Sequence, residues 1–179
     1  MRKLAAIVTL VALVLSSGNL VAFEPDVSDK MELSVAGAIL DIKTKDAGIQ
    51  RFFDDSAGYA VFPSVGKGGI VVGGAFGRGL VIVNEQVDGF ASMSQATIGL
   101  QLGGQKYSQF IFFKDQTALN HFKRGNFEFG AQASAVAITA GASADAAYDA
   151  GVAVFTIAGG GLMAEASIGG QRFSYEPKE

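Results

Sequence analysis

The chain has 179 residues, no cysteine and a formal net charge of −3 at pH 7. Without cysteine it can form neither disulfides nor a thiolate metal site, so packing alone must stabilise the fold. The net acidic charge excludes attraction to nucleic acid or anionic membranes by the overall field, so any such binding needs a local basic patch.

Residues 1–22 have the pattern of a secretory signal peptide. Two basic residues precede an apolar run that ends at Leu15, and small or polar residues follow. The run is shorter than the roughly 20 residues of a membrane-spanning helix. We expect cleavage after Ala22, or alternatively after Gly18, and a periplasmic or secreted protein without a lipid-anchor cysteine. A retained N-terminal anchor is the competing interpretation.

Residues 23–179 have the length of a single domain that can bury an ordinary hydrophobic core. They carry 12 basic and 17 acidic residues, which gives a formal charge of −5. The domain by itself is therefore also acidic.

The first part of this domain is predicted to be helical. Residues 28–45 place apolar side chains at helical intervals, and Ser28 or Asp29 can cap the helix with Glu32 in capping-box spacing. A second, short helix is predicted over 46–53. The residues expected to face inward are Met31, Val35, Ala38, Ile39 and Ile42, followed by Ile49, Phe52 and Phe53.

From Gly58 onward the sequence is rich in glycine, β-branched and aromatic residues, as is typical of strands with sharp turns. A helix over 114–124, ended by Gly125, is predicted among the strands. The alternating pattern of residues 127–138 suits a strand, although their alanines also suit a helix. Residues 139–150 are predicted to form a loop. The predicted strands are 58–62, 69–76, 79–84, 89–103, 107–112, 151–157, 161–168 and 171–175.

These elements predict an α+β fold. Glycine inside a strand marks a bulge, a bend or a close backbone approach. We therefore expect a strongly curved antiparallel β-sheet, a half barrel of glycine-rich strands, with N-terminal helices and one mid-chain helix. Strands and helices do not alternate regularly, so a doubly wound parallel sheet is not expected.

Two parts of the sequence recur. A shift of 93 positions aligns the segment that begins at Gly58 with the one that begins at Gly151. A shift of 66 positions aligns residues 102–108 with 168–174 and keeps a basic residue followed by an aromatic one. We interpret this as a β-unit used more than once, with its basic residues, Lys106 and Arg172, in equivalent places.

Motifs of catalysis are missing from the sequence. The segment 65–69 resembles a phosphate-binding loop, but it lacks the required preceding glycine and the Ser or Thr after its lysine. There is no G-x-S-x-G motif, and the single histidine, His121, is expected to be an exposed residue of the 114–124 helix. With one histidine and no cysteine, a transition-metal site is not expected. We predict neither an enzyme nor a cofactor.

Basic side chains in the glycine-rich segments are the candidate binding residues. Glycine loops let backbone amides approach an anion while a nearby Lys or Arg supplies charge. Arg78 stands out because no packing role for it is visible in the sequence, but the alternative is that all these charges are simply solvated. The candidates are Lys67, Arg78, Lys106 and Arg172, with an apolar rim of Tyr59, Phe76, Tyr107, Phe110, Phe173 and Tyr175 unless these aromatics belong to the core.

Six motifs follow one another between about 57 and 175: Ala57-Gly-Tyr-Ala-Val-Phe-Pro-Ser-Val-Gly-Lys-Gly-Gly69, Gly73-Gly-Ala-Phe-Gly-Arg-Gly79, Gly99-Leu-Gln-Leu-Gly-Gly-Gln105, Phe129-Gly-Ala-Gln-Ala-Ser-Ala-Val136, Val154-Phe-Thr-Ile-Ala-Gly-Gly-Gly-Leu-Met163 and Gly169-Gly-Gln-Arg-Phe-Ser-Tyr175. In this order they resemble the SYLF domain family, a lipid-binding domain that also binds actin in eukaryotic members. The resemblance covers most of the domain.

The resemblance implies phospholipid binding through basic residues and an N-terminal amphipathic helix, with phosphoinositides as ligands of eukaryotic relatives. Carried onto this sequence, it puts Lys67 and Arg78 forward as head-group contacts, followed by Lys106 and Arg172. The 28–45 helix departs from the family pattern because it mixes acidic and basic residues and lacks a strongly basic face. An exported bacterial-type protein would not meet actin, and phosphoinositides are not its expected ligands either, so the natural lipid stays open.

We therefore predict a non-catalytic phospholipid-binding protein of the bacterial cell envelope, which meets an anionic membrane surface and no nucleic acid. Two alternatives stay open. One is a protein-interaction or structural module with an envelope protein as partner. The other is a carrier that encloses a hydrophobic ligand within the rolled sheet.

Overall fold

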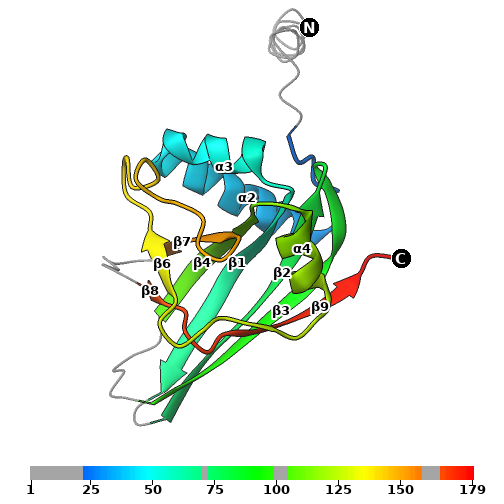
Figure 1. The fold of residues 1–179 in the computed structure, drawn as a ribbon. Coiled ribbons are helices and arrows are strands. Elements are labelled where there is room, and N and C mark those ends of the chain that lie inside the picture. Colours follow the sequence, from blue (N-terminus) through cyan, green and yellow to red (C-terminus); the bar gives the residue numbers. More distant parts are fainter. Residues whose placement is uncertain (1–21, 70–71, 99–104, 159–165) are drawn as a thin grey trace, which may run out of the picture.

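A computed structural model describes residues 22–69, 72–98, 105–158 and 166–179 (Figure 1). Nearly all of the predicted signal peptide, and parts of the predicted strands 69–76, 89–103 and 161–168, lie outside the described residues. No helix in the described ranges is long and apolar enough to cross a membrane.

Helices form where the sequence predicts them. The N-terminal ones bury the predicted apolar stripe, except that Met31 is half-buried and Glu32 is buried in addition. The mid-chain helix ends at Lys123, two residues before Gly125, whose positive φ of 80° suits the glycine that follows a helix end. The helical elements are α2 (Lys30–Lys45), the 3-10 turn η1 (Ala47–Ile49), α3 (Gln50–Asp55) and α4 (Gln116–Lys123).

The N-terminus of α2 is capped by Asp29. Its Oδ1 accepts the backbone N–H groups of Met31, at 2.7 Å, and Glu32, at 3.1 Å. Glu32 does not complete a capping box. Its carboxylate instead accepts the backbone N–H of Asp26 and the ammonium of Lys178, which ties both ends of the domain to the start of α2.

The strands form one curled sheet with the order β5-β9-β3-β2-β1-β4-β7-β6-β8. Neighbouring strands are antiparallel except for β6 and β7, which are parallel, so the predicted curved, antiparallel half barrel is confirmed apart from this pair. The strands are β1 (Gly58–Gly69), β2 (Val72–Val83), β3 (Gln86–Ile98), β4 (Gln105–Phe113), β5 (Phe127–Glu128), β6 (Ser134–Ala137), β7 (Val152–Ala158), β8 (Ala166–Ser167) and β9 (Arg172–Pro177).

The largest differences from the predicted strand boundaries concern β1, β2 and residues 127–138. The segment 65–69 is not a loop but the end of β1, and β2 runs without a break through Gly77 and Gly79. Both segments stay extended because paired strands on each side supply their ladder hydrogen bonds. Residues 127–138 form two short strands, β5 and β6, with turns between them.

A β-bulge in β1 reverses the faces of its side chains. Between Val61 and Ser64, β1 advances three residues while its neighbours advance two. Pro63 lies within this step, where the missing N–H of proline is tolerated. Phe62 before the bulge and Val65 after it both enter the same core, although they are an odd number of residues apart.

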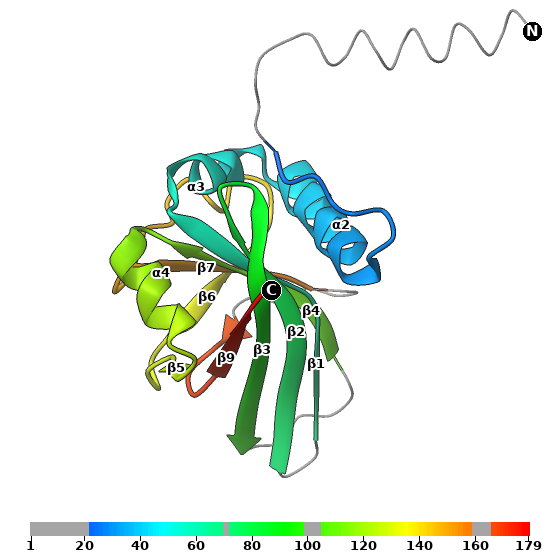
Figure 2. The same cartoon turned by 90° about the vertical axis from the view of Figure 1, so that its right-hand side faces the viewer.

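The sheet curls until segments from its two halves meet (Figures 1 and 2). Gln171, just before β9, exchanges side-chain hydrogen bonds of 2.8 and 3.1 Å with Gln109 of β4. Gln95 of β3 donates to the backbone carbonyl of Gly169 at 2.9 Å. The Gln109–Gln171 pair links β4 to the start of β9, and these two strands are not neighbours in the sheet, so it stabilises the curled form.

Hydrophobic cores lie on both faces of the sheet. We call the face toward α4 the inner face and the face toward α2 and α3 the outer face. The inner core includes Phe62, Val65, Met93, Tyr107, Ile111, Phe113, Leu119, Phe122 and Phe173. The outer core includes Val35, Ile39, Ile42, Phe52, Phe53, Val61, Leu80, Ile82, Phe110, Phe112 and Phe155.

Asp46 joins the end of α2 to the loop before β7. The side chain is 4% exposed, and its two oxygens accept the backbone N–H groups of Gly48 at 3.0 Å and Ser143 at 2.7 Å. Burial by itself would raise the pKa of Asp46, but these backbone hydrogen bonds outweigh it and hold the pKa below its usual value.

The substitution Asp46→Asn is expected to lower the free energy of unfolding by about 1–2 kcal/mol at pH 7, because it removes one charged acceptor of buried amides. A carboxyl group with a depressed folded pKa stabilises the protein above its unfolded pKa of about 3.9, and the benefit is lost as the pH falls through the folded pKa. Urea unfolding of both proteins at pH 7 and near pH 3 should show that the difference in free energy of unfolding between wild type and variant is smaller in acid. An equal difference at both pH values would contradict this, and Asp145→Asn on the same loop, where Asp145 is exposed, is the control.

Candidate functional site

Part of the outer face is not covered by α2, and it carries a row of residues across five strands. Arg172 of β9 pairs with Ser94, Ser94 with Phe76, Phe76 with Gly66, and Gly66 with Lys106 of β4. Directly paired residues of antiparallel strands face the same side. Neighbouring strands are about 4.8 Å apart, and Lys106 and Arg172 each lie two strands from the strand of Phe76. Their backbones are therefore about 10 Å from that strand.

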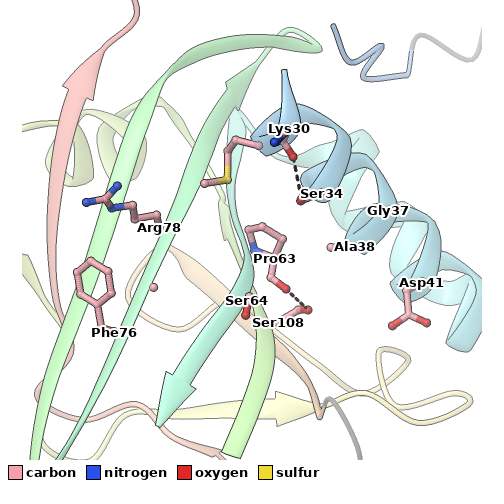
Figure 3. A pocket seen from close by; sticks show the side chains of 12 residues that line it. Lys30, Ser34, Gly37, Ala38, Asp41, Pro63, Ser64, Phe76, Arg78 and Ser108 are labelled. Carbon is pink, nitrogen blue, oxygen red and sulfur yellow. Dashed lines mark hydrogen bonds between the residues drawn. The ribbon is translucent and has the colours of Figure 1, made fainter. Parts of the chain in front are cut away.

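Arg78 lies two residues beyond Phe76 on β2 and therefore on the same face. Its guanidinium carbon is 6.0 Å from the centre of the Phe76 ring, and the two side chains are seen beside each other in Figure 3. Phe76 is 55% exposed. We call Phe76, Arg78, Lys106 and Arg172 the outer patch.

The cations of the outer patch differ in their partners. The Nε of Arg172 donates to the Oε2 of Glu128 at 3.0 Å, but both side chains are exposed and such a pair contributes under about 1 kcal/mol. Among the described residues, no carboxylate forms an ion pair with Arg78 or Lys106. These two charges are therefore available to an external anion.

Lys67 lies on the opposite face from the outer patch. It pairs with Ala75, which belongs to the inner core, so its side chain starts from the inner face. The bulge at Pro63 is the reason, because without the extra residue Lys67 would share the face of Val61, which is the outer one. The structure thus brings together three of the four candidate cations and separates the fourth.

The two sequence repeats have different structural outcomes. Lys106 and Arg172 occupy equivalent places, two strands to either side of Phe76, and each precedes an aromatic residue of the inner core. The repeat with a shift of 93 does not superpose in the same way. Its two copies lie in β1 and β7, on either side of β4. The equivalent residues Val61 and Val154 pair with successive residues of β4, so Val61 faces the outer core and Val154 the inner core.

The predicted aromatic rim is mostly core. Tyr59, Tyr107, Phe110 and Phe173 are buried and Tyr175 is half-buried, so Phe76 alone of the six is exposed. Burial raises the pKa of Tyr107 to about 12, so its hydroxyl stays neutral at ordinary pH.

Phe90 was not among the predicted residues, yet it is 42% exposed on the outer face of β3. The sequence signal that could have identified Phe90 is the alternation of inward-facing and outward-facing residues along β3. Buried Ala91, Met93 and Gln95 take turns with the more exposed Phe90, Ser92 and Ser94.

A groove of about 790 Å³ separates α2 from the outer patch (Figure 3). A second hollow of about 720 Å³ extends from Met31 and Arg78 toward Phe90. Since both hollows share Met31 and Arg78, they adjoin each other. The groove is lined by Lys30, Met31, Ser34, Gly37, Ala38 and Asp41 from α2 and by Pro63, Ser64, Phe76, Gly77, Arg78 and Ser108 from the sheet.

His121 is exposed on α4, as predicted, and its ring packs edge-on against Phe127 with the centroids 5.3 Å apart. Over the ranges that the structure describes, no three metal-ligating side chains gather in one place. The outer patch and the adjoining groove combine cations, an exposed aromatic ring and a hollow, and these properties suit binding.

Comparison with known proteins shows similarity to one family. Residues 94–179 match the family described as "Ysc84: Las17-binding protein actin regulator". Over these residues, just under half of the chain, the sequence is similar to the Ysc84 (SYLF) family. The predicted resemblance is thus confirmed, and the Ysc84 assignment supports a binding role rather than a catalytic one. The Ysc84 match includes Lys106 and Arg172, whereas Phe76 and Arg78 precede it.

A curated relative of the same family is "Beta cell expansion factor A" from Aeromonas veronii. It is 29% identical over 138 residues, which cover 76% of this chain and 52% of the relative. The chain therefore spans about half the length of this relative.

Proposed function

We propose that this protein binds anionic phospholipid at a membrane surface of the bacterial envelope, and that the outer patch makes the contact. The observation that carries the proposal is the placement of Arg78, Lys106 and Arg172 around the exposed ring of Phe76 on one face. Cations attract lipid phosphates, and an aromatic ring between them can enter the boundary between head groups and acyl chains. Such a local site can act on a protein whose net charge is −3.

The N-terminal helix plays a different part in this proposal from the one implied by the resemblance. The apolar stripe of α2, which includes Val35, Ile39 and Ile42, is buried against the sheet. A membrane could reach that stripe only if α2 left the sheet and exposed the outer core. We therefore assign the membrane contact to the outer patch and not to the apolar face of α2.

The proposed location is the periplasm or the cell exterior. The support for it is the signal-peptide pattern of residues 1–22. A protein partner is the second candidate function, because the matched family is described as binding the protein Las17. In that case the same cations would meet an acidic surface of an envelope protein.

Co-sedimentation with vesicles tests the lipid proposal. The purified protein is mixed with neutral phosphatidylcholine vesicles or with vesicles that also contain phosphatidylglycerol, at 0.1 and 1 M salt. We expect pelleting with the anionic vesicles alone, and its loss at high salt, because the Debye length falls from about 10 to about 3 Å. Equal pelleting with neutral vesicles, or none with either, would reject the proposal, and the second outcome would favour a protein partner.

A further inference from the structure

We propose that the groove between α2 and the sheet binds one single-chain anionic amphiphile, with its chain along α2 and its head group at Arg78. This inference rests on the proposed lipid binding and narrows it to one site for a monomeric ligand. The volume of about 790 Å³ lies within the roughly 300–1,000 Å³ of small-molecule sites.

The lining of the groove suits an alkyl chain. Met31 and Ala38 supply apolar surface from α2, and Pro63 and Phe76 supply it from the sheet. Figure 3 shows the α2 residues along one side of the hollow and the strands along the other. An extended chain laid between them would contact apolar side chains on both sides, which is the arrangement that holds apolar ligands.

Gly37 keeps the groove open. A Cβ atom added at this position would meet nothing within 4 Å, so packing in the described structure gives no reason for glycine here. Glycine in the interior of a helix costs about 1 kcal/mol relative to alanine. The residue lines the groove, and a larger side chain there would occupy the space that we assign to the ligand.

Charge selects the head group. Arg78 lies where the groove meets the second hollow, and none of the described carboxylates forms an ion pair with it. Asp41 also lines the groove and forms an exposed ion pair with Lys45 on the same helix, but it is one negative charge against two positive ones, Arg78 and Lys30. With Lys30 on the rim as well, the groove carries a net positive charge and favours a phosphate or carboxylate head.

The test is a titration with dodecyl phosphate, dodecanoate and the neutral dodecyl maltoside, each below its critical micelle concentration, followed by calorimetry. We expect saturable 1:1 binding of the anionic compounds, and the first two compounds distinguish a phosphate head from a carboxylate. Gly37→Leu should weaken this binding at least tenfold, while Thr44→Leu, which adds the same side chain at an exposed position of α2, should leave it unchanged. Arg78→Gln should weaken binding of the anionic compounds and remove the preference over the maltoside.

Absence of saturable binding to the wild-type protein, or equal binding by Gly37→Leu, would overturn the inference. Circular dichroism spectra of the variants establish that they are folded. Vesicle binding is measured on the same samples, so that the two proposals fail separately. If the groove alone is wrong, the protein still pellets with anionic vesicles. If the surface proposal alone is wrong, the amphiphile still binds although no vesicles are pelleted.

Discussion

The double variant Arg78→Glu/Lys106→Glu is expected to lose its binding to anionic vesicles. Each basic side chain near an anionic lipid surface contributes about 1 kcal/mol, and each reversal changes the charge by two, so the total loss is about 4 kcal/mol. This corresponds to a decrease in affinity of about a thousandfold. Both side chains are exposed, so folding should be unaffected. Co-sedimentation over a range of lipid concentrations measures the effect.

Lys67→Glu is the matched control, because it makes the same change in charge on the inner face. It should bind vesicles nearly as well as the wild-type protein, apart from a small long-range effect that salt screens. If Lys67→Glu abolished binding while the double variant bound normally, the outer patch would not be the membrane contact. Comparing these variants therefore tests which face of the sheet contacts the membrane, as well as the role of charge.

The second large effect is expected from Gly79→Ala, which should lower the free energy of unfolding by about 3 kcal/mol or more. A Cβ atom on Gly79 would lie 2.1 Å from the carbonyl oxygen of Val61 and 3.0 Å from the Cα of Phe62. These atoms belong to the backbone of β1 at its bulge, so no side-chain rotation can relieve the clash. The two strands would have to separate next to the bulge in β1.

Thermal unfolding measures this loss, and a decrease in Tm of about 6–12 °C is expected for a domain of this size. The control is Gly68→Ala in β1, where an added Cβ would meet nothing within 4 Å. That variant should differ little in stability from the wild-type protein. A Gly79→Ala protein as stable as the Gly68→Ala protein would mean that β1 and β2 are less closely packed at the bulge than described here.

Local sequence patterns predicted much of the fold. The apolar stripe of α2, the end of α4 shortly before Gly125 and the curvature of the sheet all follow from side-chain spacing or from glycine. The continuous β2 was not predictable in this way, because Gly77 and Gly79 read locally as turn residues. They stay in a strand since β1 and β3 pair with β2 along its length.

The candidate site was predicted in its residue types but not in its geometry. Lys106 and Arg172 were recognised as equivalent by their repeat, and Arg78 by its lack of a packing role. The groove beside Gly37 could not be predicted, because it depends on how α2 crosses the sheet. That placement is set by contacts of the outer core between residues far apart in the chain.

The sequence by itself determined the resemblance to the SYLF family, the α+β class and the basic residues that can meet an anion. Each of these depends on local composition, on motif order or on the spacing of apolar residues. The tertiary structure decided which cations share a face. A single extra residue at Pro63 shifts the side-chain alternation of β1, and because that alternation has a period of two, it turns Lys67 to the inner face while Arg78 stays on the outer one.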